Sequence, residues 1–202
     1  MSGILIRLAR CRSGAGAAEF ALVLPLLLLF LFGIIDVGRV MWMWNRAEKA
    51  TQMGARYAVA TNMVPAGLYS YSFSTQGGIP QGDPIPEGSF GGATCTSAGC
   101  NCDTGKTCPP LGTASVTAFA DIVQRMHYFL PDIQAANVVV QYGYSGLGYA
   151  GDPNGSDVAP LVTVSLTGLT FRPITFLAFT TIPLPDFRAA LTLEDGEGTF
   201  SN

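Results

Sequence analysis

The sequence contains one histidine, His127, and only 12% of its residues are charged. A single imidazole cannot form a histidine cluster around a metal ion, and no motif supports a serine–histidine pair. The scarcity of charge, with a mean hydropathy of +0.34, excludes an ordinary soluble protein. No basic patch is present in the larger C-terminal part, so we expect no binding of nucleic acid.

Motifs of catalysis and of cofactor binding are absent or incomplete. The sequence has no G-x-S-x-G, no P-loop and no H-E-x-x-H. Residues 146–151 match G-x-G-x-x-G, but the following Asp-Pro-Asn-Gly is typical of a turn rather than of the helix that a nucleotide site needs. Residues 152–163 begin like a calcium loop but lack its glycine and its final glutamate. We therefore expect no enzyme, no cofactor and no metal site.

One long stretch of the chain carries no charge, from Phe20 to Ile35. Its sixteen residues would reach only about 24 Å as a helix, so crossing a membrane needs an extension through Trp44. This extension includes Asp36 and Arg39, which are three residues apart and can pair on one face of the helix. No A-x-A-like site follows the apolar run. The pattern predicts a transmembrane helix that is retained, not a removable signal.

Charge is distributed asymmetrically around the apolar run. Residues 1–14 contain three arginines and no acid, whereas residues 63–202 contain four basic and eleven acidic residues. Because positive charge marks the cytoplasmic side, we expect the short N-terminal segment inside and the acidic C-terminal part outside. The predicted location is the cytoplasmic membrane, crossed once.

Four of the five cysteines form a cluster, Cys95, Cys100, Cys102 and Cys108. An even set outside the cytoplasm favours two disulfides, for which three pairings are possible. A four-cysteine zinc site is the alternative, but the usual pairs separated by a longer gap are missing.

Small residues precede the apolar run, and a single carboxylate, Glu19, follows them. A charge at the end of a membrane helix costs a few kcal/mol on insertion scales, so it needs a partner or a route to water. In the simplest interpretation, Glu19 reaches the cytoplasmic interface beside Arg12.

The segment 12–60 resembles the N-terminal segment of TadE-like pseudopilins, components of the Flp (tight-adherence) pilus machinery of bacteria. The matching features are a basic leader, a glycine, four small residues, Glu19-Phe20, an apolar stretch, and the steps Asp-Val-Gly-Arg and Gly-Ala-Arg-Tyr. The resemblance implies that a prepilin peptidase cleaves between Gly14 and Ala15. Glu19 would then be the fifth mature residue, whereas cleavage after Gly16 would make it the third.

The sequence pattern divides the chain into four predicted segments. They are a basic cytoplasmic leader (1–14), a transmembrane and extended helix (15–62), a Gly/Pro/Cys-rich loop (63–113) and an α+β extracytoplasmic domain (114–202). The last is expected to contain a helix at 114–130 and strands at 138–142, 161–167 and 187–193, with a bulge at Gly168. The predicted fold class is α+β and pilin-like, with a long N-terminal transmembrane helix, a second helix and a short antiparallel sheet.

The sequence supports two interpretations of function. In the first, suggested by the resemblance, the chain is a minor pilin-like component that helps to assemble a Flp/Tad-type pilus. Its partners would be the lipid bilayer, other pilin-like subunits, pilus assembly membrane proteins and a prepilin peptidase, and Glu19 would fix the register between subunits. In the second, it is an uncleaved, single-span membrane anchor for an extracytoplasmic binding or sensor domain. There the glycine-rich loop or the uncharged segment 174–185 would contact a ligand. In either interpretation, segment 174–185 is core or an exposed patch that meets a membrane or a partner.

Overall fold

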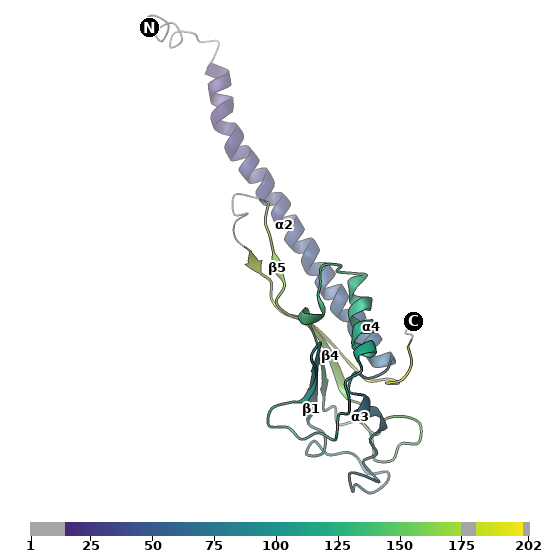
Figure 1. The fold of residues 1–202 in the computed structure, drawn as a ribbon. Coiled ribbons are helices and arrows are strands. Elements are labelled where there is room, and N and C mark those ends of the chain that lie inside the picture. The colour runs from purple at the N-terminus through teal and green to yellow at the C-terminus, as the bar shows by residue number, and fades with distance from the viewer. Residues whose placement is uncertain (1–14, 175–180, 200–202) are drawn as a thin grey trace, which may run out of the picture. The chain divides into compact units, whose positions relative to one another are not determined.

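The computed structural model describes residues 15–174 and 181–199. The chain divides into two compact units, Met1–Trp42 with Thr170–Ile182, and Met43–Leu169 with Pro183–Asn202. Figure 1 shows the long helix α2 (Ala15–Ala60), which contributes residues to both units. With further helices and an antiparallel sheet, the fold is α+β, as the sequence predicts.

The long helix agrees with its prediction to within two residues at each end. It contains 46 residues and continues through Pro25. Because the segment is rich in alanine and leucine, which are strong helix formers, its local preference and its observed structure agree.

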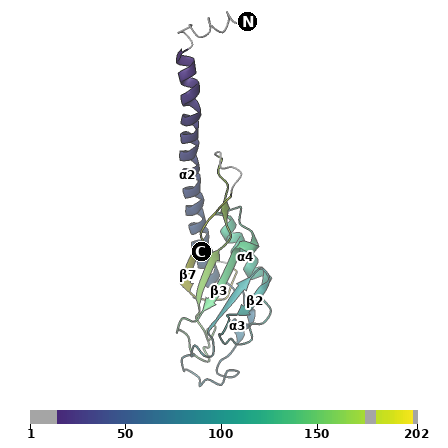
Figure 2. The same cartoon turned by 90° about the vertical axis from the view of Figure 1, so that its left-hand side faces the viewer.

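The second unit contains a five-stranded sheet in the order β2-β1-β3-β4-β7. All of its paired strands are antiparallel, and Figure 2 shows them beside helix α4 (Val116–His127). The strands are β1 (Gly92–Thr96), β2 (Gly99–Cys102), β3 (Val138–Gly143), β4 (Leu161–Leu166) and β7 (Phe187–Thr192). The strands predicted near 138, 161 and 187 are therefore confirmed.

The core of the second unit lies among the sheet, α4 and the end of α2. Val162, Val164 and Leu166 alternate along β4 and are fully buried. The small residues Ala47, Ala50 and Ala58 of α2 are equally buried, which lets the helix approach its neighbours closely. Ser115 caps α4, since its Oγ accepts a hydrogen bond from the N–H of Ala118 at 3.2 Å.

Two local predictions are wrong. The segment 63–113, read as loop, contains α3 (Ala66–Ser70), β1 and β2. The glycine-rich composition did not indicate strands, because β1 is stabilised by pairing with β3, which lies far along the sequence. No bulge forms at Gly168. Instead β4 ends at Leu166, Gly168 turns with φ of 68°, and β5 (Thr170–Phe171) pairs with β6 (Ile182–Pro183) in a separate two-stranded sheet.

A substitution at Gly54 tests how closely α2 packs in this core. A Cβ atom at Gly54 would lie 2.8 Å from Cγ and Sδ of Met126 and 3.3 Å from Cγ1 of Val164. We expect Gly54→Val to lower the free energy of unfolding by about 1–3 kcal/mol, as overpacked cores do. Thermal unfolding of the detergent-solubilised chain, followed by near-ultraviolet circular dichroism, measures the effect.

Gly38 provides the matched control, because a Cβ there would meet nothing within 4 Å. Gly38→Val should leave the midpoint nearly unchanged. Equal midpoints for the two variants would mean that α2 does not pack on α4 and β4 in this way.

Candidate membrane and assembly site

The N-terminal part of α2 has an apolar surface that the described residues do not cover. Leu22, Leu26 and Phe30, for example, are 76%, 70% and 70% exposed. The helix is long and apolar enough, by length and composition, to cross a membrane. Since a helix that is apolar on all sides must be buried in lipid or among other helices, this surface is built for contact outside its own chain.

Glu19 lies at the beginning of this apolar surface. It is the fifth residue of α2, which begins at Ala15, so the two residues are one helical turn apart on the same face. Its side chain is exposed, and no hydrogen bond or ion pair joins it to another residue within 15–174 or 181–199. Gly14, the predicted processing residue, lies outside the described residues. None of the residues that the structure describes thus supplies a cation to the carboxylate of Glu19.

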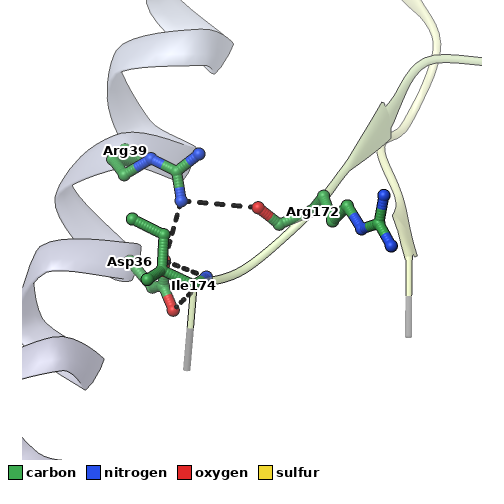
Figure 3. Close-up of polar contacts among 4 residues, drawn as sticks. All are labelled: Asp36, Arg39, Arg172 and Ile174. Atoms are coloured by element: carbon green, nitrogen blue, oxygen red, sulfur yellow. Dashed lines mark hydrogen bonds and ion pairs between the residues drawn. The ribbon is translucent and has the colours of Figure 1, made fainter. Parts of the chain in front are cut away.

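Asp36 ends the apolar run and is only 7% exposed. Its Oδ1 lies 3.0 Å from Nη1 of Arg39, as their spacing of three residues predicts. The backbone N–H of Ile174 donates to Oδ1 and Oδ2 of Asp36, with N–O distances of 2.9 and 3.0 Å. Figure 3 shows the carboxylate between these two donors. A buried carboxylate is thus neutralised by one ion pair and by charge-assisted hydrogen bonds.

Arg39 makes further contacts with the segment that carries Ile174. Its Nη1 donates to the carbonyl oxygen of Arg172 at 3.4 Å, and its guanidinium lies 5.1 Å from the centre of the Phe171 ring. Such a cation–π contact is an additional attraction. The sequence predicted the pair Asp36–Arg39 but not the segment 170–174. One signal in the sequence could have pointed to this segment: a charge at the end of an apolar run needs a second partner.

The cysteine cluster forms two disulfides, as its composition suggested. Cys95 is bonded to Cys100, directly opposite on β1 and β2, and Cys102 is bonded to Cys108. All four thiols are used in these bonds. Each closes a short loop, which restricts the unfolded chain and helps to order a segment rich in glycine and proline.

The loop at residues 152–157 has a structural role. Asp157 is 5% exposed, and its Oδ2 accepts from the N–H of Phe73 at 2.6 Å. Its Oδ1 accepts from the N–H of Asp152 at 3.0 Å. One carboxylate oxygen therefore holds the backbone of Phe73 and the other holds the backbone of its own loop. The sequence did not reveal the contact with Phe73 because Phe73 and Asp157 are 84 residues apart.

A groove of about 640 Å³ runs beside α4 in the second unit. Its walls come from α4, from the β1–β2 turn at 96–100 and from residues 112–115. His127, the only histidine, is part of the lining, with Phe119 and Val123. The groove is mostly apolar and falls in the size range of small-molecule sites.

Comparison with known proteins gives a match for one segment of the chain. No curated protein and no solved structure matches it. Residues 14–56 do match a family model, and they include Glu19, the apolar run and the pair Asp36–Arg39. The family is described as TadE-like protein, so the resemblance predicted from the sequence is confirmed over this segment.

Proposed function

We propose that the protein is a minor pilin-like (pseudopilin) component that acts in assembly of a Flp/Tad-type pilus at the bacterial inner membrane. The observation that carries the proposal is Glu19, an exposed carboxylate at the start of an uncovered apolar helix, within a segment that matches the TadE-like family. The proposed role is in assembly and not in catalysis.

The proposed mechanism uses a new amino terminus. Cleavage of the peptide bond between Gly14 and Ala15 frees the ammonium group of Ala15 and leaves the apolar helix in place. In a stack of such helices, this cation meets Glu19 of a neighbouring subunit. The attraction is strong in low dielectric and offsets the loss of hydration of both groups only when their geometry is good. The pair therefore favours one register between otherwise apolar helices.

The proposed orientation places residues 1–14 in the cytoplasm and the C-terminal domain in the periplasm. Arginines 7, 10 and 12 precede the apolar run, while the part after residue 62 is acidic. This distribution follows the positive-inside rule. The two disulfides support an oxidising compartment for the second unit.

Processing at Gly14 is the first test of the proposal. We expect the chain from membranes to migrate about fourteen residues smaller than the full sequence, and Gly14→Leu to abolish this shift, because the cut would follow Gly14. Both forms should remain in the membrane fraction, since cleavage occurs before the apolar helix. Immunoblotting of fractionated cells makes the comparison.

Gly16→Leu is the matched control, since Gly16 is the second glycine in front of Glu19. It should be processed as the unaltered chain is. A shift that persists in Gly14→Leu, or release of the chain into the soluble fraction, would contradict the proposed processing.

The groove beside α4 favours a second candidate, an uncleaved anchor that carries a binding domain. In that case the chain keeps its full length and Glu19 acts only at the membrane interface. Absence of processing in a strain with an active prepilin peptidase, together with a ligand bound at Phe119 and Val123, would favour this alternative.

A further inference from the structure

A short arm of the chain is fixed to α2 at the end of the apolar run. We define the interfacial arm as Thr170–Ile174 with Ile182, all of which belong to the same compact unit as the N-terminal part of α2. The carboxylate of Asp36 holds the backbone N–H of Ile174, and Arg39 contacts the carbonyl oxygen of Arg172. Two contacts, linked by the ion pair between Asp36 and Arg39, thus attach the arm to one turn of the helix.

The attachment defines the depth of the arm in a membrane. Asp36 directly follows Ile35, the last residue of the uncharged run, and Arg39 lies about 4.5 Å further along the helix axis. Because the span extends through Trp44, these two residues lie inside its outer end, near the interface, where paired charged groups can reach lipid headgroups. The backbone of Arg172 and Ile174 lies at the same level, because it is hydrogen-bonded to them.

The surface of the arm combines apolar side chains with one cation. Ile174 and Ile182 are 57% and 44% exposed, whereas Phe171 is buried beneath Arg39. Figure 3 shows that the side chain of Arg172 points away from α2. Within residues 15–174 and 181–199 its guanidinium has no hydrogen-bond or ion-pair partner. Arg172 is also the only charged residue from Thr170 to Pro185.

We propose that the interfacial arm is a second membrane-binding element. Ile174 and Ile182 contact the upper acyl chains of the outer leaflet, and Arg172 binds the phosphate of an anionic phospholipid. The arm therefore lies at the outer interface, between the upper acyl chains and the headgroups, and fixes the rotation of α2 about its axis. This inference requires that α2 crosses the membrane but not that the chain is processed or assembled.

Lipid is the occupant that these observations favour. The exposed isoleucines belong to the same compact unit as the uncovered apolar surface of α2, on which Ile34, Ile35 and Trp42 are 56%, 43% and 66% exposed. Isolated arginines beside apolar residues are typical of interfacial segments, where the guanidinium reaches phosphate while its stem stays in an apolar layer. A headgroup phosphate supplies the negative charge that the arm lacks.

A fluorescent label at residue 174 measures the depth of the arm. In the full-length chain, Cys11→Ser removes the fifth cysteine, which lies outside the cluster, and Ile174→Cys supplies the thiol for the label. The chain is labelled under non-reducing conditions and inserted into vesicles of phosphatidylcholine and phosphatidylglycerol. We expect strong quenching by a lipid with a nitroxide on its fifth acyl carbon and weak quenching by iodide. Because the backbone N–H of Ile174 donates these hydrogen bonds to Asp36, the cysteine preserves them.

Two further labels make the depth measurement decisive. Ile182→Cys should behave like the label at 174, and Leu147→Cys, at an exposed loop of the second unit, sets the value for water. Quenching of the 174 and 182 labels by iodide to the extent seen at 147 would overturn the proposal. Protection from both quenchers would also overturn it, since the arm would then be covered by protein.

Substitution of Arg172 tests the choice of headgroup. Native mass spectrometry of the chain released from the same vesicles should detect bound phosphatidylglycerol, reduced about fivefold in Arg172→Gln, the effect expected of one arginine near an anionic surface. Arg188→Gln, which alters an exposed arginine on β7, should retain the lipid. Equal retention by both variants, or displacement of the lipid by inorganic phosphate, would contradict lipid binding at Arg172.

Discussion

Glu19→Val is expected to abolish incorporation of the chain into pilus assemblies while its membrane insertion and its processing at Gly14 remain intact. The variant removes the only charge between Arg12 and Asp36. Valine is accepted in an apolar helix, so anchoring does not suffer. Co-purification of tagged and untagged copies from detergent-solubilised membranes measures subunit association, and counts of surface pili measure the outcome.

The reason for this large effect is the charge that would be left behind. In the proposed contact, the ammonium of Ala15 is buried against Glu19 of the next subunit. Removing one partner of such a buried pair leaves an uncompensated charge, which weakens association by on the order of a hundredfold. Glu19→Gln should also fail, since the amide retains shape and polarity but not charge.

Ala18→Val is the control at the neighbouring position, since it alters the size of a side chain and preserves the carboxylate. It should assemble. Normal pili from Glu19→Val would leave the carboxylate without a role in subunit contacts, and anchoring would be the only remaining function of the helix.

Asp36→Ala is expected to detach the segment 170–174 from α2. The change removes both oxygens that accept the N–H of Ile174 and the partner of the Arg39 guanidinium. Loss of these contacts should favour local opening by about 2 kcal/mol, roughly a thirtyfold increase in the open population. Hydrogen–deuterium exchange of a peptide covering 170–174, with the chain in lipid nanodiscs, measures the opening.

Asp36→Asn separates charge from hydrogen bonding. Its amide oxygen still accepts from the N–H of Ile174, so exchange should increase less than in Asp36→Ala. A peptide from β4, whose residues Val162 and Val164 are fully buried, should exchange equally in all three proteins. Unchanged exchange at 170–174 in Asp36→Ala would show that this carboxylate does not hold the segment.

Features that depend on local pattern were predictable from the sequence. The uncharged run indicated α2, and the alternation of Val162, Val164 and Leu166 indicated the buried face of β4. The helical spacing of Phe119, Val123 and Met126 indicated α4, and all three residues are buried. In each case the period of the apolar residues matches the element that buries them.

Features that depend on distant partners were not predictable. The strands β1 and β2 are short and contain glycine, and β1 acquires its place by pairing with β3 more than forty residues later. Asp36 and Ile174 are 138 residues apart, and their contact is made through a backbone N–H that any residue would supply. Side-chain pattern contains no signal for such a bond.

The candidate site likewise has features that the local pattern predicts and features that depend on distant partners. The positions of Glu19 and of the pair Asp36–Arg39 follow from single residues placed against an apolar run. The attachment of Phe171 and Arg172 does not, because it depends on the turn at Gly168 that ends β4 and directs the chain into β5. A bulge within one continuous strand would have placed these residues in the main sheet.

The first residue of the mature, membrane-extracted chain decides whether an ammonium group can meet Glu19. N-terminal sequencing should return Ala-Gly-Ala-Ala-Glu, beginning at Ala15. A chain that begins at Met1 or Ser2, or at any residue after Ile35, would contradict the proposed pairing of a freed amino terminus with this carboxylate.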